Sequence, residues 1–142
     1  MIPWDDDIDL GMNRSDYDRF KEICKKELNH NYFLQDMDSD YYSGFIFGKI
    51  RKNHTYMSEE YEKNVKMHHG IWVDVFPFDY VDDNIIEHEK TYKKLLFYRN
   101  LFIIKQGFKI KKKENITKKC MFYIVRSFIW MIPLQYLKNK IK

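Results

Sequence analysis

Four of the five residues at positions 5–9 are aspartate, which places a dense group of carboxylates near the start of the chain. If this segment is a β-strand, alternate side chains share a face, so Asp7 and Asp9 point to one side and Asp5 continues the same alternation. Neighbouring carboxylates repel each other unless a cation lies between them, and hard oxygen ligands suit Mg²⁺ or Mn²⁺. The spacing therefore predicts a divalent-metal site of the kind used in phosphoryl transfer.

Two other interpretations fit a cluster of acidic residues. The first is a solvated acidic surface at a chain end. The second is a calcium-binding EF-hand loop, since Asp5, Asp7 and Asp9 occupy its first three alternate ligand positions. That loop needs glycine at its sixth position and glutamate at its twelfth, where this chain has Leu10 and Asp16. The calcium loop is therefore excluded, and a solvated surface remains the alternative to a metal site.

A third carboxylate stands in a second strand-like segment, residues 70–77. There β-branched side chains alternate with Trp72, Asp74 and Phe76, so the aspartate and the two aromatic rings share one face of the strand. A carboxylate between aromatic side chains is costly to bury unless a cation or hydrogen-bond donors compensate it. If this strand pairs beside residues 7–9, Asp74 supplies the third carboxylate of the site.

Two blocks of this sequence resemble the signature of the LicD family, which includes phosphocholine transferases and is related to the fukutin-type transferases. The first block is IPWDDDIDLGM at residues 2–12, followed by RSDY at residues 14–17, and the second is IWVDVFPFD at residues 71–79. Two blocks in the order found in the family are far more specific than an Asp-x-Asp pair alone. The resemblance covers about residues 2–80.

The resemblance implies a nucleotidyltransferase-like core in which Asp7 and Asp9 hold one or two Mg²⁺ or Mn²⁺ ions against a nucleotide-diphosphate donor. It also implies that Asp74 completes the metal site and helps to deprotonate the acceptor, whereas Asp5 either assists as a further ligand or faces solvent. The implied reaction is metal-dependent transfer of a phospho-alcohol group, typically phosphocholine from CDP-choline, onto a sugar hydroxyl of a cell-surface glycan such as lipopolysaccharide or teichoic acid. In the family a helix and a glycine-rich loop precede the first block, so we expect this chain to be a fragment without that loop.

Lys49 and Arg51 lie two residues apart on another predicted strand, so they share a face. They open a basic segment, residues 49–55, that resembles a segment of the family ending in threonine. The planar guanidinium suits phosphate oxygens, so Arg51 is a candidate phosphate ligand and Lys49 a second source of positive charge. The alternative is that Arg51 is an ordinary surface side chain. His68 and His69 are adjacent and point apart, so we do not expect them to share a metal ion.

The hydrophobic pattern predicts an α/β (α+β) fold, in which a small mixed sheet is flanked by helices and followed by a helical C-terminal part. Strands are expected at residues 7–10, within 32–42, at 44–51 and at 70–77, with Pro77 ending the last one. Helices are expected after a cap at Ser15, from Asn84 to about Ile104, and from Cys120 to Leu137. We therefore divide the chain into a catalytic core over residues 1–83 and a helical, basic region over residues 84–142.

The net charge of +4 conceals a strong asymmetry along the chain. Residues 1–90 contain 20 acidic and 11 basic side chains, whereas residues 91–142 contain 1 acidic and 14 basic side chains. The basic half therefore either binds something anionic or forms a solvated face that complements the acidic half. An RNA-binding module is disfavoured, because the lysines are not interleaved with a recognisable base-stacking platform.

The apolar segment at residues 120–137 is too short and too interrupted for a transmembrane span, so it is either a core helix or a helix that lies at a membrane surface. Two cysteines, Cys24 and Cys120, give no disulfide framework, and the acidic N-terminus is unlike a signal peptide. We expect a cytoplasmic protein, with peripheral contact at the inner face of the membrane as one location. The alternatives to phosphocholine transfer are a different CDP-linked donor, such as a polyol, and a truncated remnant without catalysis.

Overall fold

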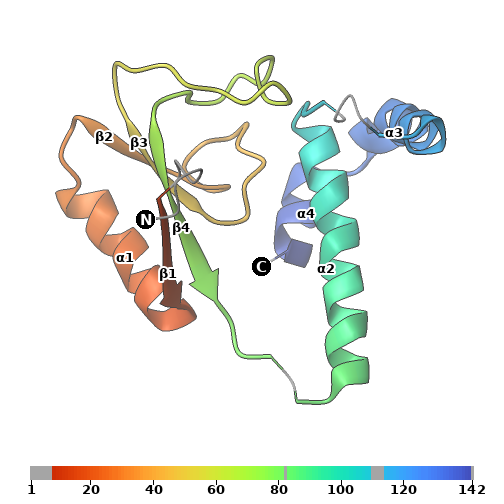
Figure 1. Cartoon of the computed structure of the whole chain (residues 1–142), viewed down its shortest axis with the longest axis horizontal. Helices are drawn as coiled ribbons and strands as arrows, with labels where there is room; N and C mark the ends of the chain where they lie inside the picture. The colour runs from red at the N-terminus through yellow and green to blue at the C-terminus, as the bar shows by residue number, and fades with distance from the viewer. Residues whose placement is uncertain (1–7, 82, 110–113, 142) are drawn as a thin grey trace, which may run out of the picture. The chain divides into compact units, whose positions relative to one another are not determined.

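The computed structural model describes residues 8–81, 83–109 and 114–141. The chain forms two compact units, Met1–Ser58 with Met67–Tyr80, and Glu59–Lys66 with Val81–Lys142. The first unit holds a β-sheet and one helix, and the second holds the remaining helices (Figure 1). The fold is α+β, with a small mixed sheet and a helical C-terminal part, as the sequence predicts.

The sheet of the first unit has four strands in the order β1-β4-β3-β2. β1 and β4 run parallel, whereas β4 with β3 and β3 with β2 run antiparallel. The strands are β1 (Asp9–Asn13), β2 (Tyr32–Gln35), β3 (Gly48–Lys52) and β4 (Trp72–Phe78). Because β1 and β4 are adjacent in the sheet, the two acidic segments of the sequence become neighbours in space.

Helix α1 (Arg14–Glu27) follows β1 directly and packs against the sheet through a buried face that includes Tyr17. Asn13 caps this helix, because its side-chain oxygen accepts the backbone N–H of Asp16 at 2.9 Å. The predicted cap at Ser15 is therefore wrong. The Ser15 hydroxyl instead donates to the same Asn13 oxygen, so it supports the cap from inside the helix.

The sheet face beneath α1 is apolar and closely packed. A Cβ atom added to Gly48 would lie 3.0 Å from the Tyr17 hydroxyl, so this glycine lets the helix approach the strand. Gly48 is paired with Val75 in the sheet, and directly paired residues lie on the same face. Val75 is fully buried, so it belongs to the core between α1 and the sheet.

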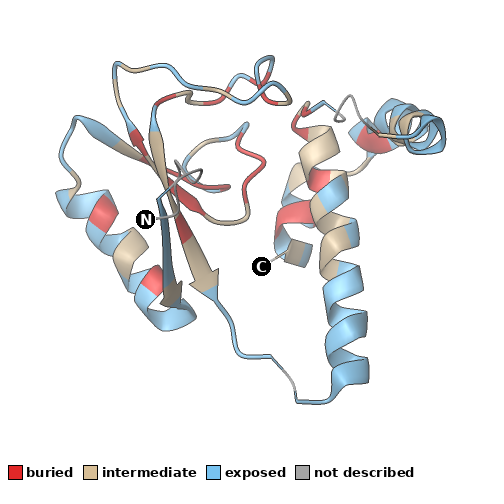
Figure 2. Cartoon of the chain, viewed as in Figure 1, coloured by how far each residue is buried: buried red, intermediate tan, exposed pale blue. Residues whose placement is uncertain are grey.

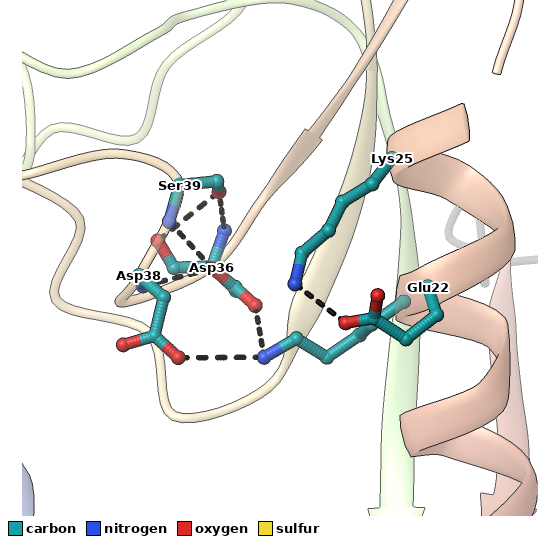
Figure 3. A network of polar contacts seen from close by, with 6 residues as sticks. Glu22, Lys25, Asp36, Asp38 and Ser39 are labelled. Atoms are coloured by element: carbon teal, nitrogen blue, oxygen red, sulfur yellow. Dashed lines mark hydrogen bonds and ion pairs between the residues drawn. The ribbon is translucent and has the colours of Figure 1, made fainter. Parts of the chain in front are cut away.

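The turn that follows β2 is tied to α1 by charge (Figure 3). The Lys21 Nζ atom lies 2.6 Å from an Asp36 oxygen and 3.5 Å from an Asp38 oxygen. The other Asp36 oxygen accepts the backbone N–H groups of Asp38 and Ser39, both at 2.8 Å. Burial raises the pKa of Asp36, but Lys21 and these N–H groups outweigh it, so the pKa lies below its ordinary value. The ionised carboxylate therefore fixes the turn.

Three strand predictions need correction. The strand predicted over residues 7–10 continues to Asn13. The strand predicted over residues 44–51 begins only at Gly48. Pro77 lies inside β4 and does not end it. The Asp74 N–H donates to the Ile8 carbonyl, on the side of β4 that faces β1. Backbone N–H groups alternate between the two sides of a strand, so the Pro77 nitrogen faces the side of β3. The pairing with β3 has already stopped at Val75. Pro77 therefore removes no hydrogen bond from the ladder with β1.

The second unit consists of helices in sequence order. They are α2 (Ile85–Lys105), α3 (Ile116–Phe128), the short 3₁₀ helix η1 (Ile129–Met131) and α4 (Leu134–Ile141). The side chain of Asn84 caps α2, as predicted, and that of Asn115 caps α3. α2 packs against α4, where Phe102 and Leu137 are fully buried, whereas most of α3 is exposed (Figure 2).

The continuous helix predicted over residues 120–137 is wrong. The segment breaks after η1, because Pro133 has no N–H to donate and its ring clashes with a preceding helical turn. No single helix in the described parts of the chain is long and apolar enough to cross a membrane. One pair of segments has the required length and composition when taken together, namely Ile116–Met131 with Leu134–Ile141. The two segments meet at a bend of 110°.

Candidate functional site

Four polar side chains form one row across the sheet. Asp9 of β1 is paired with Asp74 of β4, Asp74 is paired with Lys49 of β3, and Lys49 is paired with Gln35 of β2. Directly paired residues share a face, and alternation places this row on the face opposite α1. The pairing of the two acidic strands expected from the sequence is confirmed, and it is parallel.

Asp74 lies at the centre of this row between a like charge and an opposite one. Its Oδ1 atom is 2.6 Å from the Lys49 Nζ atom, and the two side chains are only 16% and 6% exposed. Burial raises the pKa of the Asp74 carboxyl above its ordinary value, and the nearby Asp9 carboxylate raises it further, whereas Lys49 acts in the opposite direction. Asp74 is thus a carboxylate with enhanced proton affinity, as a general base requires.

Aromatic rings surround the ammonium group of Lys49. Its Nζ atom lies 4.5 Å from the centre of the Trp72 ring, 4.6 Å from that of Phe45 and 5.3 Å from that of Phe47. A cation at such distances is attracted by the negative face of each ring. The aromatic rings therefore stabilise the ammonium group beside Asp74 in place of water. Trp72 was expected on this face, whereas Phe45 and Phe47 lie in the loop before β3 and not in the strand predicted over residues 44–51.

Arg51 is fully buried, which excludes the alternative of an ordinary surface arginine. Its Nε–H donates to the Gln35 side-chain oxygen at 2.6 Å, and a terminal N–H donates to the Gly70 carbonyl at 2.8 Å. The guanidinium also lies 4.9 Å from the centre of the Trp72 ring. Arg51 and Lys49 therefore share one aromatic neighbour on one face of the sheet, as their spacing predicts. A phosphate-binding role for either residue stays a prediction.

Behind Arg51, a buried polar network connects β2 to two loops. The Gln35 amide N–H₂ donates to an Asp40 carboxylate oxygen at 2.8 Å and to the His68 carbonyl at 3.1 Å. The same Asp40 oxygen accepts the backbone N–H of His68 at 2.8 Å. This network was missed from the sequence, because Gln35 and Asp40 belong to a short irregular segment without a recognisable motif. The network fixes the Gln35 side chain, whose oxygen in turn accepts the Arg51 Nε–H.

His68 and His69 make separate contacts, as expected. The His68 ring stacks on Phe33 at 5.2 Å and hydrogen-bonds with Asn53 at 2.8 Å, whereas the His69 ring packs against Tyr56 at 5.6 Å. Burial lowers the pKa of His68, and the nearby Arg51 charge lowers it further. The neutral His68 ring therefore acts as a packing element of the loop.

Asp79 has a structural partner at the end of β4. Its two carboxylate oxygens accept hydrogen bonds from the Arg14 guanidinium at 2.7 and 2.6 Å. The Arg14 guanidinium holds the pKa of Asp79 below its ordinary value. This bidentate pair joins the end of β4, the strand that carries Asp74, to the first residue of α1.

The predicted metal ligands fall into two groups. Asp9 and Asp74 lie side by side on β1 and β4. Asp5 and Asp7 lie outside the described residues. Within residues 8–81, 83–109 and 114–141, no three His, Cys, Asp or Glu side chains converge as metal ligands. The described site is therefore a pair of adjacent carboxylates with a buried ammonium beside one of them.

The sequence of this chain is similar to those of known proteins. Residues 1–129 match the family model described as "LicD/FKTN/FKRP, nucleotidyltransferase domain". The chain is 25% identical over 134 residues to the lipopolysaccharide cholinephosphotransferase LicD of Haemophilus influenzae. That alignment covers 91% of this chain and 48% of the relative, so the chain spans about half the length of the curated relative that it matches. No solved structure matches the chain.

The family model covers both acidic strands, the neighbouring strand β3, and most of the helical unit. Its match therefore includes Asp9, Asp74, Lys49 and Arg51, the residues that the sheet gathers on one face. A match over so much of the chain shows that this protein belongs to the LicD/FKTN/FKRP family of nucleotidyltransferase domains.

Proposed function

We propose that this chain carries the catalytic strands of a transferase that moves phosphocholine from a CDP-choline-type donor to a sugar hydroxyl of a cell-surface glycan such as lipopolysaccharide. Membership of the LicD/FKTN/FKRP family and the name of the Haemophilus influenzae relative support a transferase of this class. The observation that carries the proposal is the row of Asp9, Asp74 and Lys49 across three adjacent strands. The protein would work where nucleotide-linked donors are made, in the cytoplasm.

Asp9 and Asp74 are suitable ligands for Mg²⁺ or Mn²⁺, because both are carboxylates, neighbouring in the sheet, and the charge of Asp9 already raises the pKa of Asp74. Asp7 and Asp5 are proposed as further ligands on the basis of their spacing in the sequence. When bound, such an ion would neutralise negative charge on the donor phosphates and on the leaving nucleotide. The chemistry of the domain would then be nucleotidyltransferase-like.

In the proposed reaction, Asp74 accepts the proton of the acceptor hydroxyl, for which its raised pKa suits it. The hydroxyl oxygen forms a bond to the phosphorus that bears choline. The bond from that phosphorus to the bridging oxygen breaks, and the nucleoside monophosphate leaves with the electron pair of that bond. Lys49 and Arg51 supply fixed positive charge for the phosphate oxygens, and Trp72 holds both cations in position.

A donor-binding experiment tests this proposal directly. CDP-choline is titrated into the whole chain in the presence of Mn²⁺ and followed by calorimetry. We expect wild type to bind and Lys49→Met to bind about tenfold more weakly. Lys25→Met removes an exposed lysine of α1 and serves as the matched control, with unchanged affinity. CDP-glycerol, titrated in parallel, tests a polyol donor. Failure of wild type to bind CDP-choline, or equal affinities for wild type and Lys49→Met, would contradict the proposal.

A further inference from the structure

Helix α3 and the following η1 carry an apolar surface that the second unit leaves exposed. Met121, Ile124 and Phe128 are 64%, 61% and 63% exposed. Their spacing of three and four residues places them on one side of the helix. Trp130 and Met131 of η1 are exposed as well and continue the apolar surface beyond the end of α3. We call this set of five residues the α3 face. Figure 2 shows α3 largely in the colour of exposed residues.

The charged side chains of α3 itself are all basic. Arg126 lies on the opposite side of α3 and contacts the Phe122 ring at 5.8 Å, and Lys118 flanks the apolar side chains one turn before Met121. Glu114, the single acidic residue after position 90, is paired with Lys118 at 3.0 Å. An apolar stripe on a helix whose polar side is basic is the pattern of helices that lie on anionic lipid surfaces.

We infer that the α3 face binds the surface of an anionic lipid bilayer. The apolar side chains would enter the boundary between headgroups and acyl chains, and the basic side chains would remain among the anionic headgroups. Trp130 suits this position, because an indole ring prefers the interface between lipid and water. A neutral protein groove would use the apolar stripe but would gain nothing from the basic side chains of α3. The inference does not depend on the proposed transfer reaction.

The test uses the whole chain and vesicles that differ only in charge. Flotation measures binding to vesicles of phosphatidylcholine alone and to vesicles of equal parts phosphatidylcholine and phosphatidylglycerol. We expect binding to the anionic vesicles to be at least about tenfold tighter and to weaken with added salt. The double variant Ile124→Ser with Phe128→Ser should lose at least about tenfold of this affinity.

The double variant Ile85→Ser with Ile86→Ser is the matched control. Both isoleucines are exposed at the start of α2, outside the α3 face, so vesicle binding should be unchanged. All substituted side chains are exposed, and circular dichroism checks that each variant folds. Equal binding to neutral vesicles, or equal binding by both double variants, would overturn the inference. Self-association that the α3 variant abolishes, without any vesicle binding, would instead assign the face to a contact between copies of the chain.

Discussion

The Lys49 Nζ atom lies 2.6 Å from Asp74 Oδ1, and the two residues are directly paired across β3 and β4. Asp9 is paired with Asp74 on the other side of β4. The sheet therefore sets one carboxylate between a partner of opposite charge and a partner of like charge. The charge of Lys49 offsets that of Asp74. This relationship connects the fold to the proposed chemistry.

Replacing Lys49 by methionine should destabilise the protein. The variant leaves Asp74 buried beside Asp9 without its ammonium partner, and breaking such a buried pair costs about 3 kcal/mol in the free energy of unfolding. Chemical denaturation at neutral pH measures this loss. Lys25→Met breaks an exposed pair on α1 and should change the stability little. Equal stability of Lys49→Met and wild type would contradict a structural role for the pair.

The same variant should show a defined pH dependence. The folded-state pKa of Asp74 is already above its ordinary value, and removal of Lys49 raises it further. A carboxyl whose pKa is higher in the folded state than in the unfolded state destabilises the folded state when it ionises. The free energy of unfolding therefore falls as the pH rises above the unfolded-state pKa of that carboxyl. The stability deficit of Lys49→Met should therefore be largest near neutral pH and shrink toward about pH 4. A deficit that does not change with pH would argue against an ionised Asp74.

Trp72 should matter through its aromatic face. Its ring contacts both Lys49 and Arg51, and each cation–ring contact contributes about 0.5–2 kcal/mol, depending on desolvation. We expect Trp72→Leu to lose about 2 kcal/mol of stability and Trp72→Phe to recover about half of it. Urea denaturation compares the two variants, with Trp130→Leu at an exposed site as the control. Equal losses in Trp72→Leu and Trp72→Phe would indicate a loss of packing alone.

The Lys21–Asp36 pair should contribute stability that disappears in acid. Asp36 has a lowered pKa, so its contribution is fully present above the ordinary aspartate pKa of about 3.9 and is lost as the pH falls through the folded value. Asp36→Asn should cost about 2 kcal/mol at neutral pH. The difference from wild type should stay constant down to about pH 4 and shrink below it. The exposed Glu22–Lys25 pair on the same helix provides a comparison through Glu22→Gln, which should have little effect. A stability difference between wild type and Asp36→Asn that persists in strong acid would show that the Lys21–Asp36 ion pair does not cause it.

Much of the site follows from alternation alone. The period-2 pattern of residues 70–77 places Asp74 with Trp72 on one face, and the structure confirms this arrangement. The N-cap at Asn84 was also predictable, because the amide oxygen of asparagine accepts the first free N–H groups of a helix. The break at Pro133 and the position of Pro77 were misjudged for opposite reasons. Pro133 falls where a continuous helix would need a backbone N–H. Pro77 falls where its nitrogen faces a side of β4 that has no paired strand.

The surroundings of Arg51 could not be predicted from sequence. Its partners, Gln35 and Gly70, lie 16 and 19 residues away, on another strand and in a loop. Their approach depends on the register of β2 with β3 and on a glycine at position 70, where a Cβ atom would collide with the Lys52 carbonyl. Local patterns do not encode such contacts. The candidate site residues were named from the sequence and stay predictions, whereas the packing around them required the fold.

Binding of Mn²⁺ tests the central claim most directly. Wild type, Asp9→Asn and Asp74→Asn are compared by electron paramagnetic resonance, with and without CDP-choline. Asp18→Asn replaces an exposed aspartate of α1 and serves as the control. We predict that wild type and Asp18→Asn bind Mn²⁺ equally, that each site variant binds at least about tenfold more weakly, and that CDP-choline tightens binding to wild type. Unchanged Mn²⁺ affinity in both Asp9→Asn and Asp74→Asn would contradict the assignment of these two carboxylates as the metal site.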